Sequence, residues 1–234
     1  MGLSHMVSSV SYPLYSRLQD DKQDLLNMLR RNIKAITYIN FPLMVLLMIA
    51  AKPVMVLFFG DKWLPSVPYF QILCMAGLIM PVNISNRDLF AALGRSRVSF
   101  RVQIAYEIVG IALIVGGMHF GIEGLIWGRV AAYYFLFVLN AAIARRLIGY
   151  GLWAQLRDVL PNLAISLLAG AGIYLLAQRL HLAPLLQTLS IGATYAALYL
   201  LLSVVTHNAT FVLFWHLGKG FVVRYMPWAD KQKG

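Results

Sequence analysis

The chain has 234 residues, of which 60% are hydrophobic and only 12% are charged, and its formal net charge is +11. Soluble domains average about 45–50% apolar and about 25% charged residues, so this composition excludes an ordinary soluble globule. The positive charge argues for membrane orientation rather than nucleic-acid binding, because Lys and Arg form short clusters beside apolar stretches and no basic-aromatic motif accompanies them. We therefore expect membrane lipids, and no nucleic acid, as partners.

Six apolar stretches approach or reach the length of about 20 residues that a membrane-spanning helix needs. They cover residues 35–51, 67–93, 98–118, 122–144, 159–180 and 185–205. Only a turn around Phe120 and Gly121 separates the third stretch from the fourth, which predicts an antiparallel hairpin. The sequence thus predicts an all-α fold, a polytopic transmembrane helical bundle of about six helices.

Basic residues collect in every second gap between these stretches. The rich gaps contain Arg17, Lys22, Arg30, Arg31 and Lys34, then Arg95, Arg97 and Arg101, then Arg145, Arg146 and Arg157, and finally Lys219, Arg224, Lys231 and Lys233. The gaps between them hold only Lys52 and Lys62, then no basic residue, then Arg179. Because basic loops remain on the cytoplasmic side, the pattern places both termini in the cytoplasm.

The segments outside the stretches complete the expected organisation. Residues 54–59 are too short to cross a membrane and, with Trp63, predict a short helix at the outer surface. We expect residues 1–34 to hold the end of an incomplete helix and a cytoplasmic loop. Residues 35–147 then supply four membrane helices, residues 148–206 two further ones, and residues 207–234 an amphipathic cytoplasmic tail.

Charged residues inside the stretches are candidates for function, because burying a charge at membrane depth costs about 2.5–3.5 kcal/mol on insertion scales. They are Arg87 and Asp88 in the second stretch, Glu107 in the third and Arg129 in the fourth. Counting from the expected turns puts Arg87, Glu107 and Arg129 within a few residues of the same depth.

Two interpretations of these charges remain open. In the first, Arg87 and Arg129 line a cavity with Asn83 and Asn86, and the arginines bind a diphosphate or an acidic sugar. Glu107 and Asp88 then form charge pairs with them, or Glu107 titrates to couple transport to a proton. In the second, the same charges form ion pairs that fix helix register, or extend toward the cytoplasmic surface.

We find no pattern of residues typical of an enzyme. The five histidines are scattered without metal-ligand spacing, and Cys74 is a lone cysteine inside an apolar stretch. The sequence therefore predicts no catalytic residues, no metal and no cofactor.

Three short motifs between residues 9 and 101 carry a family resemblance. They are Pro13, Ser16, Arg17, Leu18 and Gln19, then Lys52, Pro53, Gly60 and Trp63, then Ala92, Leu93, Gly94 and Arg95. In this order the motifs resemble the C-terminal portion of the polysaccharide transporter branch of the multidrug/oligosaccharidyl-lipid/polysaccharide exporter superfamily. Beyond residue 101 the resemblance continues mainly in the order and length of the stretches.

The resemblance implies a two-lobe bundle in the bacterial inner membrane that moves a lipid-linked saccharide by alternating access. The implied substrate is an undecaprenyl-diphosphate-linked saccharide used to build lipopolysaccharide, capsule or exopolysaccharide. Since the first lobe is not in this chain, we expect a fragment of a longer transporter, or half of a split one with a separate N-terminal lobe. The alternatives are a membrane-bound polymerase or acyltransferase of polysaccharide assembly, and a drug exporter of the same superfamily.

Overall fold

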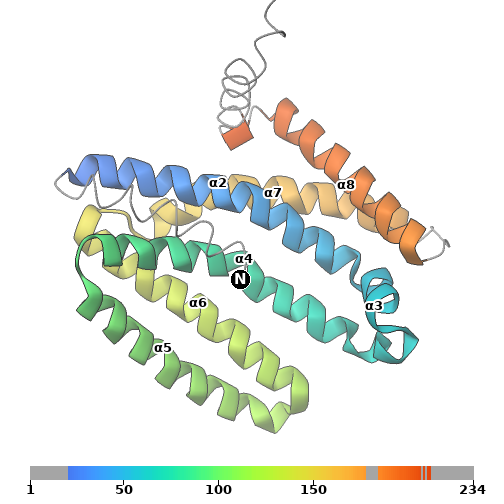
Figure 1. Ribbon diagram of the computed structural model, residues 1–234, viewed down its shortest axis with the longest axis horizontal. Coiled ribbons are helices and arrows are strands. Elements are labelled where there is room, and N and C mark those ends of the chain that lie inside the picture. The colour runs from blue at the N-terminus through green and yellow to red at the C-terminus, as the bar shows by residue number, and fades with distance from the viewer. Residues whose placement is uncertain (1–20, 178–183, 207, 209, 212–234) are drawn as a thin grey trace, which may run out of the picture.

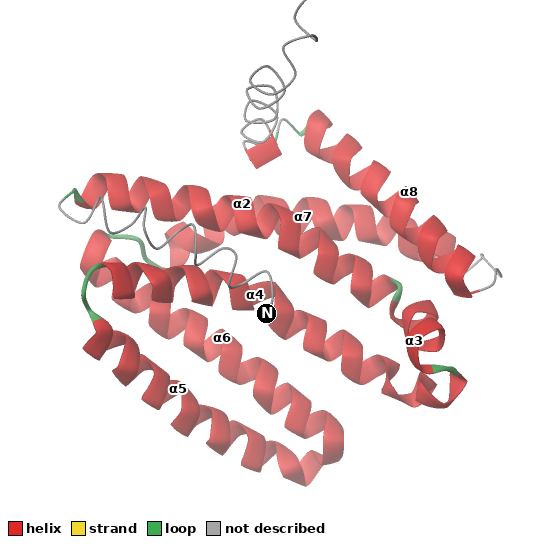
Figure 2. Ribbon diagram, in the orientation of Figure 1, coloured by secondary structure: helices red, strands yellow, loops and turns green. Residues whose placement is uncertain are grey.

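The computed structural model describes residues 21–177, 184–206, 208, 210 and 211, and all regular elements within them are helical (Figure 2). The α-helices are α2 (Lys22–Ile49), α3 (Ala51–Phe59), α4 (Val67–Ala92), α5 (Ser96–Gly117), α6 (Gly121–Ile148), α7 (Leu152–Ala177) and α8 (Pro184–Val205). Two 3-10 segments, η1 (Asp61–Ser66) and η2 (Met118–Phe120), lie before α4 and α6. The predicted all-α fold is confirmed.

Five continuous helical stretches in the described part of the chain are long and apolar enough to cross a membrane. One of them, Ser96–Ile148, has 53 residues and contains both α5 and α6, which turn back on each other at η2. The stretches therefore contain six long helices, in agreement with the prediction of about six. The chain is a multi-pass membrane protein.

Helix α2 begins well before the apolar stretch that predicted it. The Asp21 carboxylate accepts hydrogen bonds from the backbone N–H groups of Gln23 and Asp24, at 2.7 and 3.2 Å, and so caps the helix start. Asp24 lies in the first turn, where a negative charge complements the helix dipole. Residues 22–34, which the apolar pattern assigned to a loop, are therefore helical, because capping rather than hydropathy sets this boundary.

The α5–α6 hairpin is packed backbone to backbone through glycines. A Cβ atom on Gly128 would lie 2.5 Å from the carbonyl oxygen of Leu113, and one on Gly117 would overlap the carbonyl oxygen of Gly124. Gly121, at φ 72°, takes the left-handed conformation that turns the chain into α6. Such small-residue contacts let membrane helices approach closely where the hydrophobic effect adds little.

The remaining helices pack outward from this hairpin in a continuous series. Helix α4 contacts α6, α2 contacts α4 and α7, and α8 contacts α7 and α3 (Figure 1). One apolar cluster, which includes Leu25, Leu29 and Phe90, joins α2 and α4 to α6 and α7. A second, which includes Ile173, Tyr195 and Tyr199, joins α7 and α8 to the second half of α2.

The connections that carry basic residues lie at one end of the bundle. Figure 1 shows the start of α2, the α4–α5 connection and the α6–α7 connection at the left, and α3 and the α5–α6 turn at the opposite end. This is the arrangement that the positive-inside pattern requires. The predicted tail over residues 207–234 falls almost wholly outside the described residues, as do residues 1–20, so the cytoplasmic position of both termini stays a prediction.

Candidate functional site

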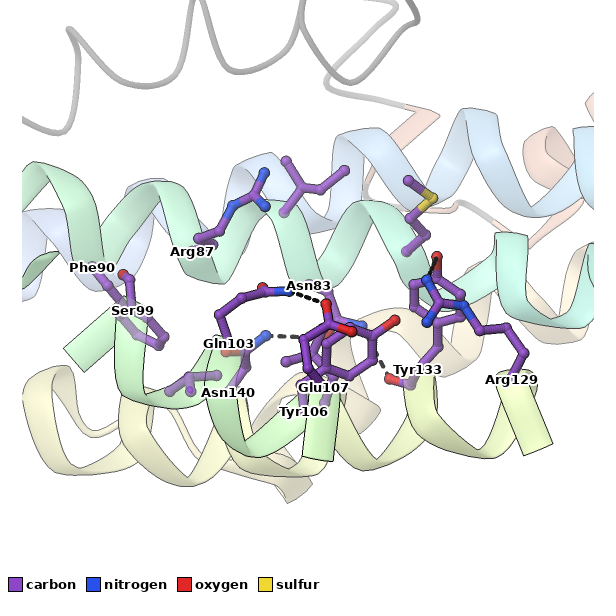
Figure 3. A pocket seen from close by; sticks show the side chains of 14 residues that line it. Asn83, Arg87, Phe90, Ser99, Gln103, Tyr106, Glu107, Arg129, Tyr133 and Asn140 are labelled. Carbon is purple, nitrogen blue, oxygen red and sulfur yellow. Dashed lines mark hydrogen bonds between the residues drawn. The ribbon is translucent and has the colours of Figure 1, made fainter. Parts of the chain in front are cut away.

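A cavity of about 200 Å³ lies between α4, α5 and α6 (Figure 3). Its polar lining consists of Asn83 and Arg87 from α4, Ser99, Gln103, Tyr106 and Glu107 from α5, and Arg129, Tyr133 and Asn140 from α6. Four of the six residues singled out in the sequence, namely Asn83, Arg87, Glu107 and Arg129, therefore line one cavity. All of them lie on membrane-spanning helices, where polar groups are costly to keep.

Arg129 is held against two aromatic rings. Its guanidinium carbon lies 5.4 Å from the centre of the Tyr106 ring and 4.8 Å from that of Tyr133. One of its terminal nitrogens also donates a hydrogen bond to the Tyr133 hydroxyl, at 3.3 Å. A desolvated cation over a ring gains about 2 kcal/mol, so the two tyrosines help to keep a positive charge at this depth.

Two buried amides form the wall of the cavity where α4 meets α6. The Asn140 side chain donates to the Asn83 side-chain oxygen at 3.1 Å, and Asn83 in turn donates to the backbone carbonyl of Tyr133 at 3.1 Å. The side chains of Asn83 and Asn140 are buried, at 5% and 2% exposure for the residues. Because both are tied into this network, the wall is rigid and its polar atoms are fixed in orientation.

Glu107 does not form the ion pair with an arginine of the cavity that both interpretations allowed. Glu107 is exposed and accepts a hydrogen bond from the Gln103 amide at 2.7 Å. Within the described part of the chain, its carboxylate forms no ion pair with Arg87 or Arg129. Arg87 is exposed and extends from α4, and Figure 3 shows it apart from Arg129, which extends from α6. A shared depth does not bring side chains together unless their helix faces also converge.

Asn86 and Asp88 do not line this cavity, whereas the first interpretation placed Asn86 in it and Asp88 in a charge pair. Asn86 faces α7, where it exchanges two hydrogen bonds with the Gln155 amide, both at 3.1 Å. Asp88 is buried at 9% exposure and is not among the residues that line the cavity. Neither of these two residues lies on the side of α4 that carries Asn83 and Arg87. Counting residues from the turns estimates depth in the membrane but does not tell which side of the helix a residue occupies.

A second polar cluster, at the end of the bundle with the basic connections, centres on Asp158 of α7. Its side chain, 4% exposed, accepts two hydrogen bonds from Arg30 at 2.7 and 3.0 Å and forms an ion pair with Lys34 at 3.0 Å. The Tyr150 hydroxyl donates to the same carboxylate at 2.9 Å. Burial, and then the adjacent carboxylate, raise the pKa of Tyr150 far above its usual value, so this phenol remains a donor.

The sequence pattern alone does not single out Asp158 as a site residue. One feature of the sequence could have pointed to it: Asp158 is the single acidic residue in a connection whose other charged residues are Arg145, Arg146 and Arg157. Nearby, the Asn162 amide donates to the Lys34 carbonyl and the Thr37 hydroxyl, both at 3.0 Å. The buried polar side chains of α7 thus face α2 and α4 and attach the last two helices to the rest of the bundle.

Neither polar cluster has the composition of a metal centre. In residues 21–177 and the shorter described segments after them, no group of three or more His, Cys, Asp or Glu side chains is placed to hold a metal ion. Arginine, tyrosine and amide groups make up most of the polar lining of the cavity instead. Such groups bind oxygen-rich organic molecules through hydrogen bonds.

Comparisons with known proteins point to one biological setting. Residues 2–68 match a family described as polysaccharide biosynthesis protein. The chain is 26% identical to the lipopolysaccharide biosynthesis protein WzxC of Escherichia coli over 73% of its length, which is 36% of the relative. It is 31% identical, over 70% of its length and 32% of the relative, to an uncharacterized membrane protein in the cps region of Klebsiella pneumoniae.

A third relative matches a somewhat shorter part of the chain. The chain is 23% identical to the teichuronic acid biosynthesis protein TuaB of Bacillus subtilis, over 63% of its length and 30% of the relative. No solved structure matches the chain. The chain spans about a third of the length of the curated relatives that it matches.

Proposed function

We infer that this chain belongs to the polysaccharide transporter family of membrane proteins and is the C-terminal part of a flippase for lipid-linked saccharides. Its work would be to carry an undecaprenyl-diphosphate-linked saccharide across the bacterial inner membrane for lipopolysaccharide, capsule or exopolysaccharide synthesis. The relatives named for lipopolysaccharide and teichuronic acid biosynthesis support this class of cargo.

The observation that carries the proposal is the polar cavity around Arg129. A helix bundle that served only as an anchor would gain nothing from an arginine, a glutamate and several amides on one cavity at membrane depth. A saccharide crossing the membrane needs such groups, because its hydroxyls lose their hydrogen bonds to water on the way. The cavity supplies replacement partners.

Alternating access would require a second lobe that packs against this one. We propose that an N-terminal lobe, in the same polypeptide or in a separate one, faces the open side of α5. That helix exposes Ile104, Ile108 and Ile111 and buries only Val102, Tyr106 and Gly110. Glu107 lies on the same helix and is exposed beside the cavity.

Replacing Arg129 by Ala in the complete transporter tests the proposal. We expect the loss of at least about 90% of surface polysaccharide, because the variant leaves Tyr106 and Tyr133 without the cation that organises them and the cargo without its charged partner. Arg129→Lys should restore only a small part, since a lysine lacks the planar fork of donors. The measurement is polysaccharide at the cell surface, with the amount of membrane-inserted protein determined by immunoblot.

Arg146→Ala is the matched control, because Arg146 is exposed near the basic end of α6 and touches neither cavity nor Asp158. Normal export by Arg129→Ala at normal protein levels would refute the role of the cavity. An enzyme of polysaccharide assembly predicts a different result, namely unaltered translocation of the lipid-linked unit with loss of its polymerisation or acylation. A drug exporter predicts a change in drug resistance with surface polysaccharide unaffected.

A further inference from the structure

We propose that the α5 side of this cavity binds the hydroxyl groups of one sugar ring, rather than the diphosphate of the lipid carrier. The inference rests on the proposed function and specifies which part of the cargo the cavity recognises. Three properties of the cavity carry it, namely its unsatisfied hydroxyls, its charge and its size.

Two hydroxyl groups on α5 lack the hydrogen bond that their burial demands. The side-chain oxygens of Tyr106 and Ser99 are shielded from solvent and make no hydrogen bond of normal geometry to any described residue. Tyr106 as a residue is only 4% exposed, yet it lines the cavity. Leaving a buried hydroxyl without a partner is unfavourable, so a native structure keeps one there for a reason.

These hydroxyls form a row with two other polar groups. Ser99, Gln103 and Tyr106 follow one another at helical spacing along the cavity side of α5, and Glu107 lies beside Tyr106. Gln103 donates one N–H group to Glu107. The side-chain carbonyl oxygen of Gln103 and the second carboxylate oxygen of Glu107 remain as acceptors. The row therefore offers both donors and acceptors, which suits hydroxyl groups because each of them both donates and accepts.

The charge on the α5 side of the cavity opposes a diphosphate as its ligand. Among the described residues that line the cavity, Glu107 is the charged residue that α5 contributes, whereas Arg87 and Arg129 approach from α4 and α6 (Figure 3). Phosphate sites usually gather several cations or helix N-termini and contain no carboxylate. A carboxylate that faces the ligand would repel a diphosphate but accept hydrogen bonds from a polyol.

The size of the cavity limits it to a single ring. Its volume of about 200 Å³ lies below the roughly 300–1,000 Å³ of pockets that enclose drug-sized ligands. A whole oligosaccharide does not fit in this space, whereas one ring placed along the Ser99–Tyr106 row does. The remaining sugars of the cargo would then lie outside the cavity.

Saturation-transfer NMR on the full chain in nanodiscs tests the proposal, with methyl β-glucopyranoside and inorganic pyrophosphate as probes. We expect transfer of magnetisation to the ring protons of the glycoside, and no displacement of the glycoside by pyrophosphate. Tyr106→Phe and Ser99→Ala should each weaken the apparent affinity about fivefold, as expected for one hydrogen bond. Tyr174→Phe is the matched control, because it removes a hydroxyl from the exposed face of α7.

Thermal unfolding separates recognition from folding. Because the Tyr106 hydroxyl has no partner of normal geometry in the described chain, Tyr106→Phe should leave the midpoint of unfolding unchanged while it weakens glycoside binding. A lowered midpoint with unchanged binding would assign the hydroxyl to structure and overturn the proposal. Displacement of the glycoside by pyrophosphate, or the absence of any transfer from the glycoside, would also overturn it.

The outcome is independent of the test of the proposed function. If surface polysaccharide depends on Arg129 but the glycoside does not bind at Tyr106 and Ser99, the flippase stands and the sugar-ring subsite fails. If the glycoside binds there but surface polysaccharide does not depend on the cavity, the subsite stands and the flippase fails.

Discussion

At the scale of single residues, Asp158 shows how a buried charge is kept in a membrane protein. Its carboxylate is 4% exposed, but Arg30, Lys34 and Tyr150 together direct four donors at its two oxygens. A buried carboxylate is tolerated when its charge is paired and its lone pairs are hydrogen-bonded. Arg129 uses the opposite device, a cation shielded by two tyrosine rings, and so remains accessible to a ligand in the cavity.

Replacing Asp158 by Ala should destabilise the protein by about 2 kcal/mol. We place the value below the range for fully buried pairs because the side chains of Arg30 and Lys34 are 42% and 32% exposed and can turn to solvent or lipid headgroups. Thermal unfolding in detergent measures the change, and Asp61→Ala, at an exposed residue of η1, is the control. Equal midpoints for the two variants would show that the cluster does not hold α7 in place.

At the scale of elements, the α5–α6 hairpin is the most closely packed unit that lines the cavity. Gly128 meets the backbone of Leu113 directly, so the distance between the two helices is fixed by atoms that cannot move aside. Tyr106 lies on α5 and Arg129 on α6, hence their stacking depends on that distance. The glycines of the hairpin thus set the geometry of the cavity, although they are not part of its lining.

Gly128→Ala should destabilise the hairpin by about 1–3 kcal/mol, the usual cost of overpacking. The matched control is Gly116→Ala on the same hairpin, where an added Cβ meets no atom within 4 Å and should be neutral or slightly stabilising. The unfolding midpoint and glycoside binding should fall together for Gly128→Ala and stay unchanged for Gly116→Ala. If the two variants behave alike, close packing at Gly128 does not control the cavity.

Some of these features could be predicted from the sequence, and the reason others could not is physical. Length and hydropathy predicted the long helices, and an arginine at membrane depth singled out Arg129, because both signals are local. The start of α2 was placed too late since Asp21 caps it outside the apolar stretch. Asn86 was assigned to the cavity, although it bonds to Gln155 on α7, because which helix faces which neighbour depends on packing rather than on composition.

At the scale of the whole molecule, the bundle has one basic end and one end with few charges. The basic connections at α4–α5 and α6–α7 and the start of α2 share the first end, while α3 and the α5–α6 turn share the second (Figure 1). Transmembrane bundles orient so that the basic end stays in the cytoplasm. The cavity, which runs between Ser99 near the basic end and Arg129 toward the other, would then span part of the path between the two sides (Figure 3).

Cysteine labelling in intact cells tests this orientation. Cys74 is buried and is the single cysteine of the chain. The labelling of each introduced cysteine can therefore be measured without a contribution from an exposed native thiol. A membrane-impermeant maleimide should label Lys62→Cys and Glu123→Cys, and should label Arg97→Cys and Arg146→Cys only after the membrane is permeabilised. All four positions are exposed, which controls for access. The reverse pattern would show that the bundle is inserted the other way round.

The cluster at Asp158 also fixes an order of events while the chain is being made. Arg30 leaves the ribosome 128 residues before Asp158 does, which at about 5–20 residues per second is a delay of roughly 6 to 26 s. During that interval Arg30 and Lys34 have no carboxylate to bind, and Thr37 lacks the amide of Asn162. The contacts of α2 with α7 therefore form only after α7 has been synthesised, and synthesis that stops before α7 leaves α2 with its contacts to α4 and α6 but without these partners.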